Sequence, residues 1–342
     1  MPSLRTNLTD KLGIDVPIIQ APVGSGTTPT LAAAVSNAGG LGMLSGTWRE
    51  PEALRSLIRE TKALTDRPFG VNLVLHWPPE ERLAICLEEQ VPIISFFWGD
   101  PTPYIPSVHG AGGLVLHTIG SAEEAKRAVA GGVNVVVAQG WEAGGHVWGT
   151  IATMALVPAV VDAVAPVPVV AAGGIGDGRG IAAALTLGAA GAWLGTRFLM
   201  SAEASVHPDY QARIAAATEA DTVYTTLFDG GWPDAPHRTI RTPTVQRWEA
   251  AGHPPSGRRP GEGDVVGTGD GNEPIHRYTD MLPGPATRAE MDDLALYAGQ
   301  SAGVVAAVQP AAEIVQTLVK EMARALRGAA ALTAGDENPS PG

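Results

Sequence analysis

A histidine follows a predicted buried strand across a glycine-rich turn in the middle of the chain. Residues 135–139 read VVVAQ and residues 140–146 read GWEAGGH, so three β-branched residues lead through glycines to His146. Consecutive valines are typical of a strand buried in a parallel sheet. A glycine turn at the carboxyl end of such a strand can present a histidine that exchanges protons near neutral pH. The sequence therefore makes His146 a candidate catalytic residue, and a loop histidine without a role in chemistry is the alternative.

Two further glycine turns have the composition of phosphate-binding loops. Gly173 and Gly174 follow the seventh predicted strand, and Gly195 and Thr196 follow the eighth. Because glycine has no Cβ, several backbone N–H groups can converge on phosphate oxygens at such turns. In barrels of alternating strands and helices, the loops after strands seven and eight often form a phosphate site. The pair of turns favours phosphate binding over ordinary turns, which also use glycine.

Polar side chains also end three other predicted strands. Asn72, His117 and Gln139 stand at the carboxyl ends of the third, fifth and sixth strands. Amides both donate and accept hydrogen bonds, which suits the mixed edge of a planar heterocycle. After the first strand, backbone groups and a flat apolar wall would come from Ala21, Pro22 and Val23. Convergence at one end of the sheet favours a shared ligand site, although each residue alone could make a structural hydrogen bond.

The elements that position these residues form a regular series of eight strand–helix units. Strands are expected at 17–20, 41–44, 69–73, 92–96, 113–117, 134–139, 167–172 and 191–194, and helices at 28–37, 51–64, 79–90, 105–110, 121–130, 153–164 and 177–187. Eight units favour an α/β protein with a closed (β/α)8 TIM barrel over an open doubly wound sheet. An open sheet would carry GxGxxG after its first strand, and QAPVGSG at 20–26 does not fit that pattern.

The alternation predicts the domain organisation. We expect residues 1–200 to form the barrel, residues 201–286 a polar insertion that caps the substrate side after strand eight, residues 287–327 a helical segment that closes the barrel, and residues 328–342 a disordered tail. A flexible surface excursion is the alternative for the insertion. A partly ordered cap is favoured because aromatic side chains are costly to leave in water, and the insertion holds Tyr224, Phe228, Trp232 and Trp248.

Composition excludes several classes of function. The net charge of −12 over 342 residues argues against a nucleic-acid-binding surface, but backbone N–H groups could still hold a phosphate-bearing cofactor. The single cysteine, Cys86, cannot form an intrachain disulfide, and its helical pattern predicts a buried apolar residue. The N-terminal residues lack an apolar signal region and no apolar run is long enough to span a membrane, so we expect a cytoplasmic protein with no metal site.

Taken in order, the motifs resemble those of the nitronate monooxygenase family, formerly called 2-nitropropane dioxygenases. The resemblance covers about residues 10–200 and reappears at 298–303. The matching stretches are QAP at 20–22, TP at 28–29, LAAAVSNAGGLG at 31–42, GVN at 70–72, QG at 139–140 with GGH at 144–146, AAGGI at 171–175 and LGTRF at 194–198. Two segments depart from the pattern on the expected substrate side, Val147–Trp148 and 252–269.

The resemblance implies FMN at the barrel mouth. Its phosphate would lie on the two glycine turns, and its ring near Asn72, Gln139 and residues 21–23, with His117 at its edge. His146 matches the family's catalytic histidine, and Gly144 and Gly145 in the same turn would also bind the cofactor.

The activity that the resemblance implies is oxidation of alkyl nitronates by O₂ to a carbonyl compound and nitrite. The partners would be a small-molecule substrate and O₂, with no nucleic acid or membrane, and a homodimer is left open. An NAD(P)H-dependent flavin reductase of quinones or enoyl thioesters on the same barrel is the alternative. A non-catalytic flavin-binding protein is less favoured because the glycine-rich loop carries a histidine.

Overall fold

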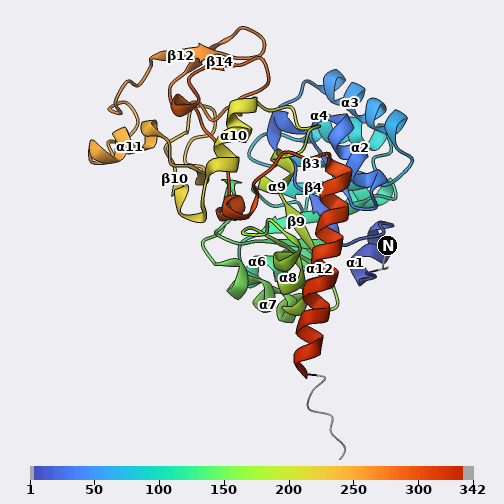
Figure 1. Cartoon of the computed structure of the whole chain (residues 1–342). Coiled ribbons are helices and arrows are strands. Elements are labelled where there is room, and N and C mark those ends of the chain that lie inside the picture. Colours follow the sequence, from blue (N-terminus) through green and yellow to red (C-terminus); the bar gives the residue numbers. More distant parts are fainter. Residues whose placement is uncertain (1–3, 334–342) are drawn as a thin grey trace, which may run out of the picture.

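An eight-stranded parallel barrel forms the centre of the molecule in the computed structural model, which describes residues 4–333 (Figure 1). The strands follow the order β1-β9-β8-β6-β5-β4-β3-β2, and a parallel bridge between Ile19 and Leu41 joins the first strand to the last. The predicted (β/α)8 barrel is therefore confirmed. Its strands are β1 Ile18–Gln20, β2 Gly42–Ser45, β3 Phe69–Val74, β4 Ile93–Phe97, β5 Leu114–Ile119, β6 Val135–Gln139, β8 Val169–Ala172 and β9 Gly191–Leu194.

Helices alternate with the strands and cover the outside of the barrel. Side-chain caps fix several helix starts, because Thr28, Ser121 and Asp177 accept hydrogen bonds from backbone N–H groups of the first turn. The short helix α1 (Asn7–Leu12) packs Leu8 and Leu12 into the barrel interior. The outer helices are α2 Pro29–Asn37, α3 Pro51–Leu64, α4 Glu80–Glu88, α5 Ile105–Gly110, α6 Ala122–Ala130, α7 Thr153–Val164 and α8 Gly178–Thr186, and the one-turn helix α9 (Thr196–Leu199) follows β9.

Side chains of the barrel strands alternate between two cores. On β5, Val115 and Ile119 pack into the layer between sheet and helices, whereas Leu116 packs into the barrel interior. On β6, Val136 faces the outer layer and Val137 the interior. Successive residues of a strand point to opposite faces, so the position of a residue decides whether its side chain can reach the barrel mouth.

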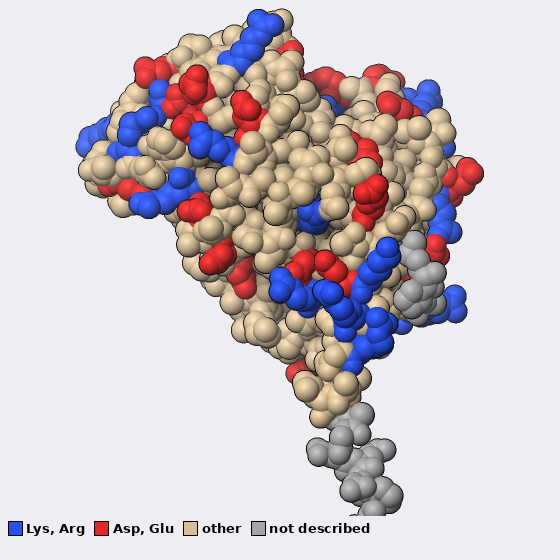
Figure 2. All heavy atoms as spheres, viewed as in Figure 1, with Lys and Arg blue, Asp and Glu red and all other residues tan. Residues whose placement is uncertain are grey.

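The segment after α9 builds a second lobe beside the barrel mouth, drawn yellow to orange in Figure 1. Acidic and basic side chains are interspersed over its surface (Figure 2). Two three-stranded sheets are present, with strand orders β10-β11-β7 and β13-β12-β14. Strand β7 (Gly145–His146) comes from the loop after β6. The elements after α9 are α10 Pro208–Ala216, β10 Thr222–Thr225, β11 His237–Ile240, α11 Pro243–Ala250, β12 Val265–Thr268, β13 Pro274–His276 and β14 Arg288–Ala289.

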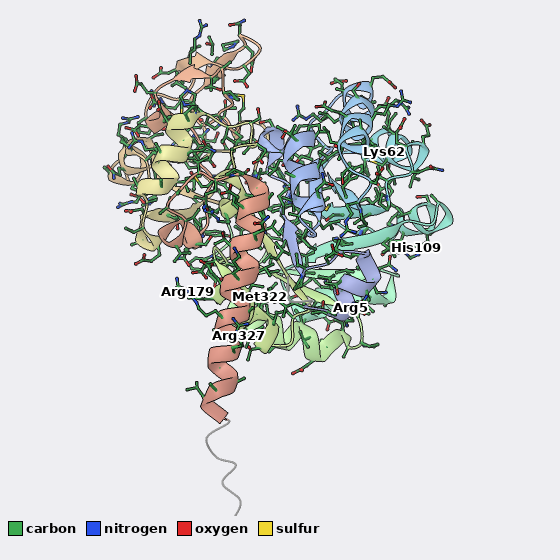
Figure 3. All side chains as sticks on the ribbon, turned by 45° about the vertical axis from the view of Figure 1, so that its right-hand side comes forward. Arg5, Lys62, His109, Arg179, Met322 and Arg327 are labelled. Atoms are coloured by element: carbon green, nitrogen blue, oxygen red, sulfur yellow. The ribbon has the colours of Figure 1, made fainter. Side chains whose placement is uncertain are left out.

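The C-terminal helical segment differs from the expectation of 287–327. Residues 287–310 form β14 and short 3₁₀ turns, and helix α12 (Ala311–Thr333) begins only after Pro310, where the Glu203 carboxylate accepts the backbone N–H of Ala311. Helix α12 packs along α8, with Met322 buried and Arg327 exposed (Figure 3). The predicted disordered tail is wrong for 328–333, which continue α12, and its remainder at 334–342 lies outside the described residues.

Within residues 4–333, no helix combines the length and the apolar character that crossing a membrane requires.

Candidate active site

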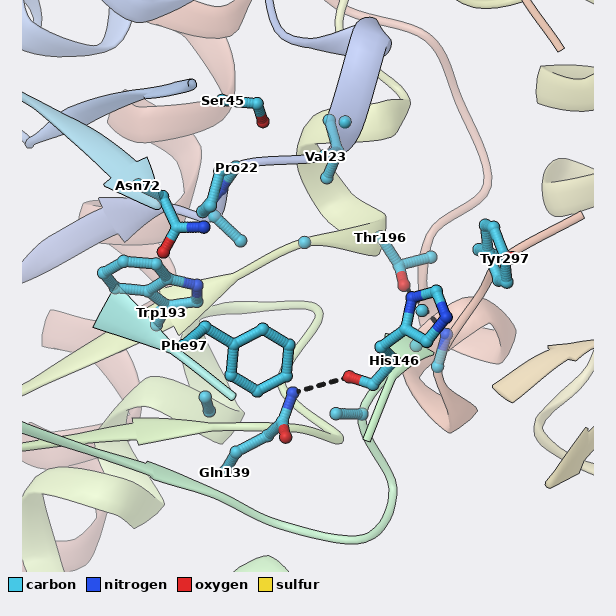
Figure 4. A pocket seen from close by; sticks show the side chains of 18 of the residues that line it. Pro22, Val23, Ser45, Asn72, Phe97, Gln139, His146, Trp193, Thr196 and Tyr297 are labelled. Atoms are coloured by element: carbon cyan, nitrogen blue, oxygen red, sulfur yellow. Dashed lines mark hydrogen bonds between the residues drawn. The ribbon is translucent and has the colours of Figure 1, made fainter. Parts of the chain in front are cut away.

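A cavity of about 410 Å³ opens at the carboxyl ends of the barrel strands (Figure 4). Figure 4 shows Pro22, Asn72 and Trp193 on one side of it and His146 and Thr196 on the other. The structure brings together every predicted site residue except one, so the following line the same cavity: Ala21, Pro22, Val23, Asn72, Gln139, Gly144, Gly145, His146, Gly173, Gly174, Gly195 and Thr196.

His117 is the exception, and the structure corrects its predicted position. It lies between Val115 and Ile119 in the strand alternation, on the side that faces the helices. Its Nδ1 lies 3.1 Å from the carbonyl oxygen of Phe96, and burial lowers its pKa to about 4. The sequence predicts a strand end at residue 117, whereas β5 continues to Ile119. The next residue, Thr118, is on the same face as Leu116 and lines the cavity instead.

The glycine turns after β8 and β9 differ in what their glycines do. Gly173 and Gly174 have φ of +97° and +72°, a region that favours glycine. A Cβ on Gly173 would stand 2.8 Å from the carbonyl oxygen of Gly140, so the protein itself requires that glycine. Gly195 has φ of −99°, and a Cβ there would meet only the Ala21 Cβ, at 3.7 Å. Gly195 therefore leaves space on the cavity side that the fold does not fill.

The turn that carries His146 is fixed by backbone packing against the second lobe. A Cβ on Gly144 would overlap the backbone of Gly299, so this glycine permits two chain segments to touch. Gly145 has φ of +70° and then enters the two-residue strand β7. In the antiparallel pairing with β11, His146 lies opposite His237. The position of His146 thus depends on a strand of the second lobe.

The imidazole of His146 lies half-buried among aromatic rings. Its ring centroid lies 4.0 Å from that of Trp232 at an interplanar angle of 31°, and 5.7 Å from that of Tyr297. Burial, with a smaller contribution from His237, lowers its pKa to about 3, so the ring is neutral at physiological pH. Its Nε2 is buried and has no hydrogen-bond partner within the described chain. A buried polar atom without a partner is unusual in a folded protein and is expected to meet a ligand or water.

Gln139 holds the backbone on either side of His146. Its Nε2 donates to the carbonyl oxygen of His146 at 3.0 Å, shown dashed in Figure 4, and its Oε1 accepts the N–H of Trp148 at 2.9 Å. These bonds engage the donor and the acceptor end of the amide. Gln139 lines the cavity, but its amide already serves to position the turn.

His237 supports β7 as a neutral imidazole. Its Nδ1 lies 3.0 Å from the carbonyl oxygen of Ala235, and its Nε2 accepts the N–H of Phe228 at 3.3 Å. These partners assign the proton to Nδ1, and burial lowers the pKa to about 4. Protonation of Nε2 would abolish the hydrogen bond from Phe228, so His237 stays neutral beside His146 of the paired strand β7.

Sequence reasoning missed several lining residues. Thr118 could have been found from the strand alternation, whereas the residues from the second lobe reach the cavity only through long-range packing. The missed residues include Ser45, Phe97, Trp193, Trp232, Asp280, Tyr297 and Ser301.

Among the described residues that line the cavity there is no Lys or Arg. Burial and the nearby Asp229 raise the pKa of the Asp280 carboxyl to about 6. The cavity therefore offers backbone N–H groups and aromatic surface rather than cationic side chains.

Comparisons with known proteins show what the chain is similar to. A family model described as Nitronate monooxygenase matches residues 5–80 and 77–321. The chain is 35% identical to the Nitronate monooxygenase of Pseudomonas aeruginosa, over 93% of this chain and 99% of that protein. It is 40% identical to the (3aS,4S,5R,7aS)-5-hydroxy-7a-methyl-1-oxo-octahydro-1H-indene-4-carboxyl-CoA dehydrogenase of Rhodococcus jostii, over 74% of this chain and 70% of that protein. The solved structure of FabK from Thermotoga maritima superposes with a TM-score of 0.79 at 33% identity, covering 96% of this chain and 99% of that one.

Proposed function

The chain belongs to the nitronate monooxygenase family, and from this premise we propose that it oxidises alkyl nitronates with O₂ by means of FMN. Membership makes the chain an oxidoreductase. In the proposed reaction two nitronate anions and one O₂ balance two carbonyl compounds and two nitrite ions. The observation that carries the proposal is the meeting of two glycine turns with the unpartnered imidazole of His146 in one cavity.

FMN fits the residues that line this cavity. The cavity volume of about 410 Å³ lies in the range of ligand sites, about 300–1,000 Å³. The phosphate would be held by backbone N–H groups of Gly173–Gly174 and Gly195–Thr196, where the space beside Gly195 is open. The ring would lie toward Asn72 and residues 21–23. Bound FMN supplies an electron acceptor for the substrate that O₂ can reoxidise.

His146 would act on the nitro group as a neutral imidazole. With a pKa lowered to about 3, its ring is neutral at pH 7 and can donate one hydrogen bond and accept another. A hydrogen bond to a nitro oxygen would orient the substrate carbon. Where a neutral nitroalkane is accepted, the free ring nitrogen would take the α-proton, although a low pKa makes the imidazole a weak base. The stacking on Trp232 and the strand pairing of β7 hold the ring in place for either task.

The proposal is tested by purifying the protein, identifying the released flavin and measuring nitrite from a panel of nitronates in air. We expect a yellow protein that releases FMN on denaturation and forms nitrite while O₂ is consumed. A colourless protein that does not take up FMN would refute the cofactor assignment. A yellow protein that forms no nitrite from any nitronate would refute the reaction while leaving the flavin site intact.

A second candidate function is reduction of a neutral acceptor, a quinone or an enoyl thioester, by NAD(P)H. Two observations favour it: the described cavity lining has no cationic side chain, and the Rhodococcus jostii relative is named as a dehydrogenase of a CoA ester. Anaerobic mixing with NADH and with NADPH separates the two candidates. Rapid bleaching of the flavin supports the reductase, and a flavin that stays oxidised supports nitronate oxidation.

A further inference from the structure

Five of the eight tryptophans of the chain meet at the rim of the candidate active site. We call this group the tryptophan wall, and its members are Trp48, Trp77, Trp98, Trp148 and Trp232. Four of them follow the strands β2, β3, β4 and β7, and the fifth, Trp232, comes from the second lobe. Each ring contacts at least one other, with centroid distances from 4.8 to 6.2 Å. Chain segments far apart in sequence thus contribute to one aromatic surface.

The wall runs from the half-buried imidazole of His146 to solvent. Trp232 is 1% exposed and stacks on His146, while Trp148 and Trp48 are 38% and 51% exposed. Trp48 and Trp232 line the cavity, and Trp98 contacts the rings of His146, Trp148 and Trp232. Large side chains that remain exposed beside a cavity mark a place where an apolar partner binds. The wall is therefore a continuous apolar surface along which a substrate can approach His146.

Backbone strain accompanies the wall at its centre. Trp98 has φ of +65°, a conformation that is disfavoured for a bulky residue and that commonly occurs at functional sites. Trp148 stands two residues after His146. Its indole N–H donates to the Glu124 carboxylate at 3.1 Å, which fixes the ring at the rim. The wall therefore has one indole on a disfavoured backbone conformation and one held at the rim by a hydrogen bond.

We propose that the tryptophan wall makes the enzyme selective for nitronates that carry an aromatic ring over short-chain alkyl nitronates. The inference rests on the proposed nitronate oxidation. Ring pairs in edge-to-face or offset contact gain energy beyond simple burial of apolar area, and a flat ring can take the place of one more member of the cluster. A short alkyl group gains no such contact. The nitronate carbon would lie at His146, and the ring would lie against Trp48 and Trp232.

The test compares kcat/KM for the nitronates of phenylnitromethane and nitroethane, using the flavin-loaded enzyme. We expect the wild type to favour the aryl nitronate by about two- to tenfold, the scale of one good aromatic contact. Trp48→Ala and Trp232→Leu should each lower this ratio toward one. Trp48 is half-exposed, so its variant should fold even if the buried Trp232 variant does not. Trp248→Leu, which lies in α11 and contacts His253 instead of the wall, is the matched control and should keep the wild-type ratio.

Equal kcat/KM values for the two nitronates in the wild type would overturn the inference, and so would an unchanged ratio in Trp48→Ala. If no nitronate yields nitrite, the proposed function fails, and the wall is then tested by binding alone. Nitrobenzene has no α-hydrogen and cannot form a nitronate, so its binding by equilibrium dialysis reports only the aromatic surface. Weaker binding by Trp48→Ala than by Trp248→Leu supports the wall, and equal binding refutes it.

Discussion

The backbone N–H groups of Gly173–Gly174 and Gly195–Thr196 form the proposed phosphate site, which we call the phosphate cradle. Replacement of Gly195 by valine tests it without straining the protein. The residue has φ of −99°, which any residue can adopt, and a Cβ would meet only Ala21, at 3.7 Å. The three added carbons would occupy the cavity space where phosphate oxygens are proposed to meet the backbone. Loss of even one hydrogen bond to a charged group costs about 1.5–3 kcal/mol. We therefore expect Gly195→Val to weaken FMN binding by at least about tenfold.

The assay measures the Kd for FMN by titrating flavin-free protein, together with the free energy of unfolding of that protein. Unfolding should change by less than about 1 kcal/mol, because only a helix N-cap preference is altered. Gly110→Val is the matched control, since Gly110 is exposed and a Cβ there meets nothing within 4 Å. Wild-type affinity in Gly195→Val would show that the phosphate lies elsewhere.

Gly174→Val is a weaker test of the same cradle. Gly174 has φ of +72°, and a Cβ there would already stand 3.4 Å from the Glu142 Cβ. Backbone strain at such a position costs about 1–2 kcal/mol for a residue other than glycine. Reduced flavin content in Gly174→Val, although expected, would therefore mix strain with loss of the phosphate site.

Four further outcomes are expected. His146→Ala should retain FMN and lose about 10²–10⁴-fold in the rate of nitronate oxidation; a wild-type rate with full flavin would remove its catalytic role. Gln139→Leu should retain FMN but lower kcat, because the turn around His146 loses two hydrogen bonds, and a rate equal to the wild type would show that the turn holds itself. His117→Ala should lower the unfolding temperature and leave flavin content unchanged, since the ring lies outside the cavity; early loss of flavin would contradict this placement. The pKa of Asp280 is raised to about 6, above its value near 4 in an unfolded chain, so the native state binds the proton more tightly and loses stability as pH rises from about 4 to 6. Asp280→Asn should abolish this loss of stability, measured by urea unfolding at several pH values. An identical pH dependence in the variant would refute the assignment to Asp280.

The barrel and its glycine turns could be predicted because their signals are local. Runs of β-branched residues such as Val135–Val137 form strands wherever two faces are buried, and the glycines at 173 and 174 are required by their own backbone conformation. The error at His117 came from judging β5 by its expected end and not by its alternation. His117 is on the same face of β5 as Val115 and Ile119, which pack against the helices, so its side chain cannot reach the mouth wherever the strand ends.

The second lobe could not be predicted from local patterns. Its contribution to the site depends on pairing between β7 and β11, whose residues His146 and His237 are 91 positions apart in the chain. Strand β7 has two residues, which is too few for an alternation of apolar and polar residues to predict a strand. The role of Gln139 was hidden for the same reason, because its partners at 146 and 148 are fixed only when β7 is formed.

The barrel and the second lobe contribute different parts of the site, so substitutions in each should affect different properties of the enzyme. The proposed cradle lies on β8, β9 and their turns, whereas the segment from β10 to β11 carries both Trp232, which stacks on His146, and His237, which pairs with it. A substitution in that segment can alter the tryptophan wall and the position of the His146 imidazole together while leaving the glycine turns unchanged. Substrate preference is therefore expected to vary with residues 222–240 at constant flavin affinity. A change in flavin affinity should instead require changes in the turns at 173–174 and 195–196.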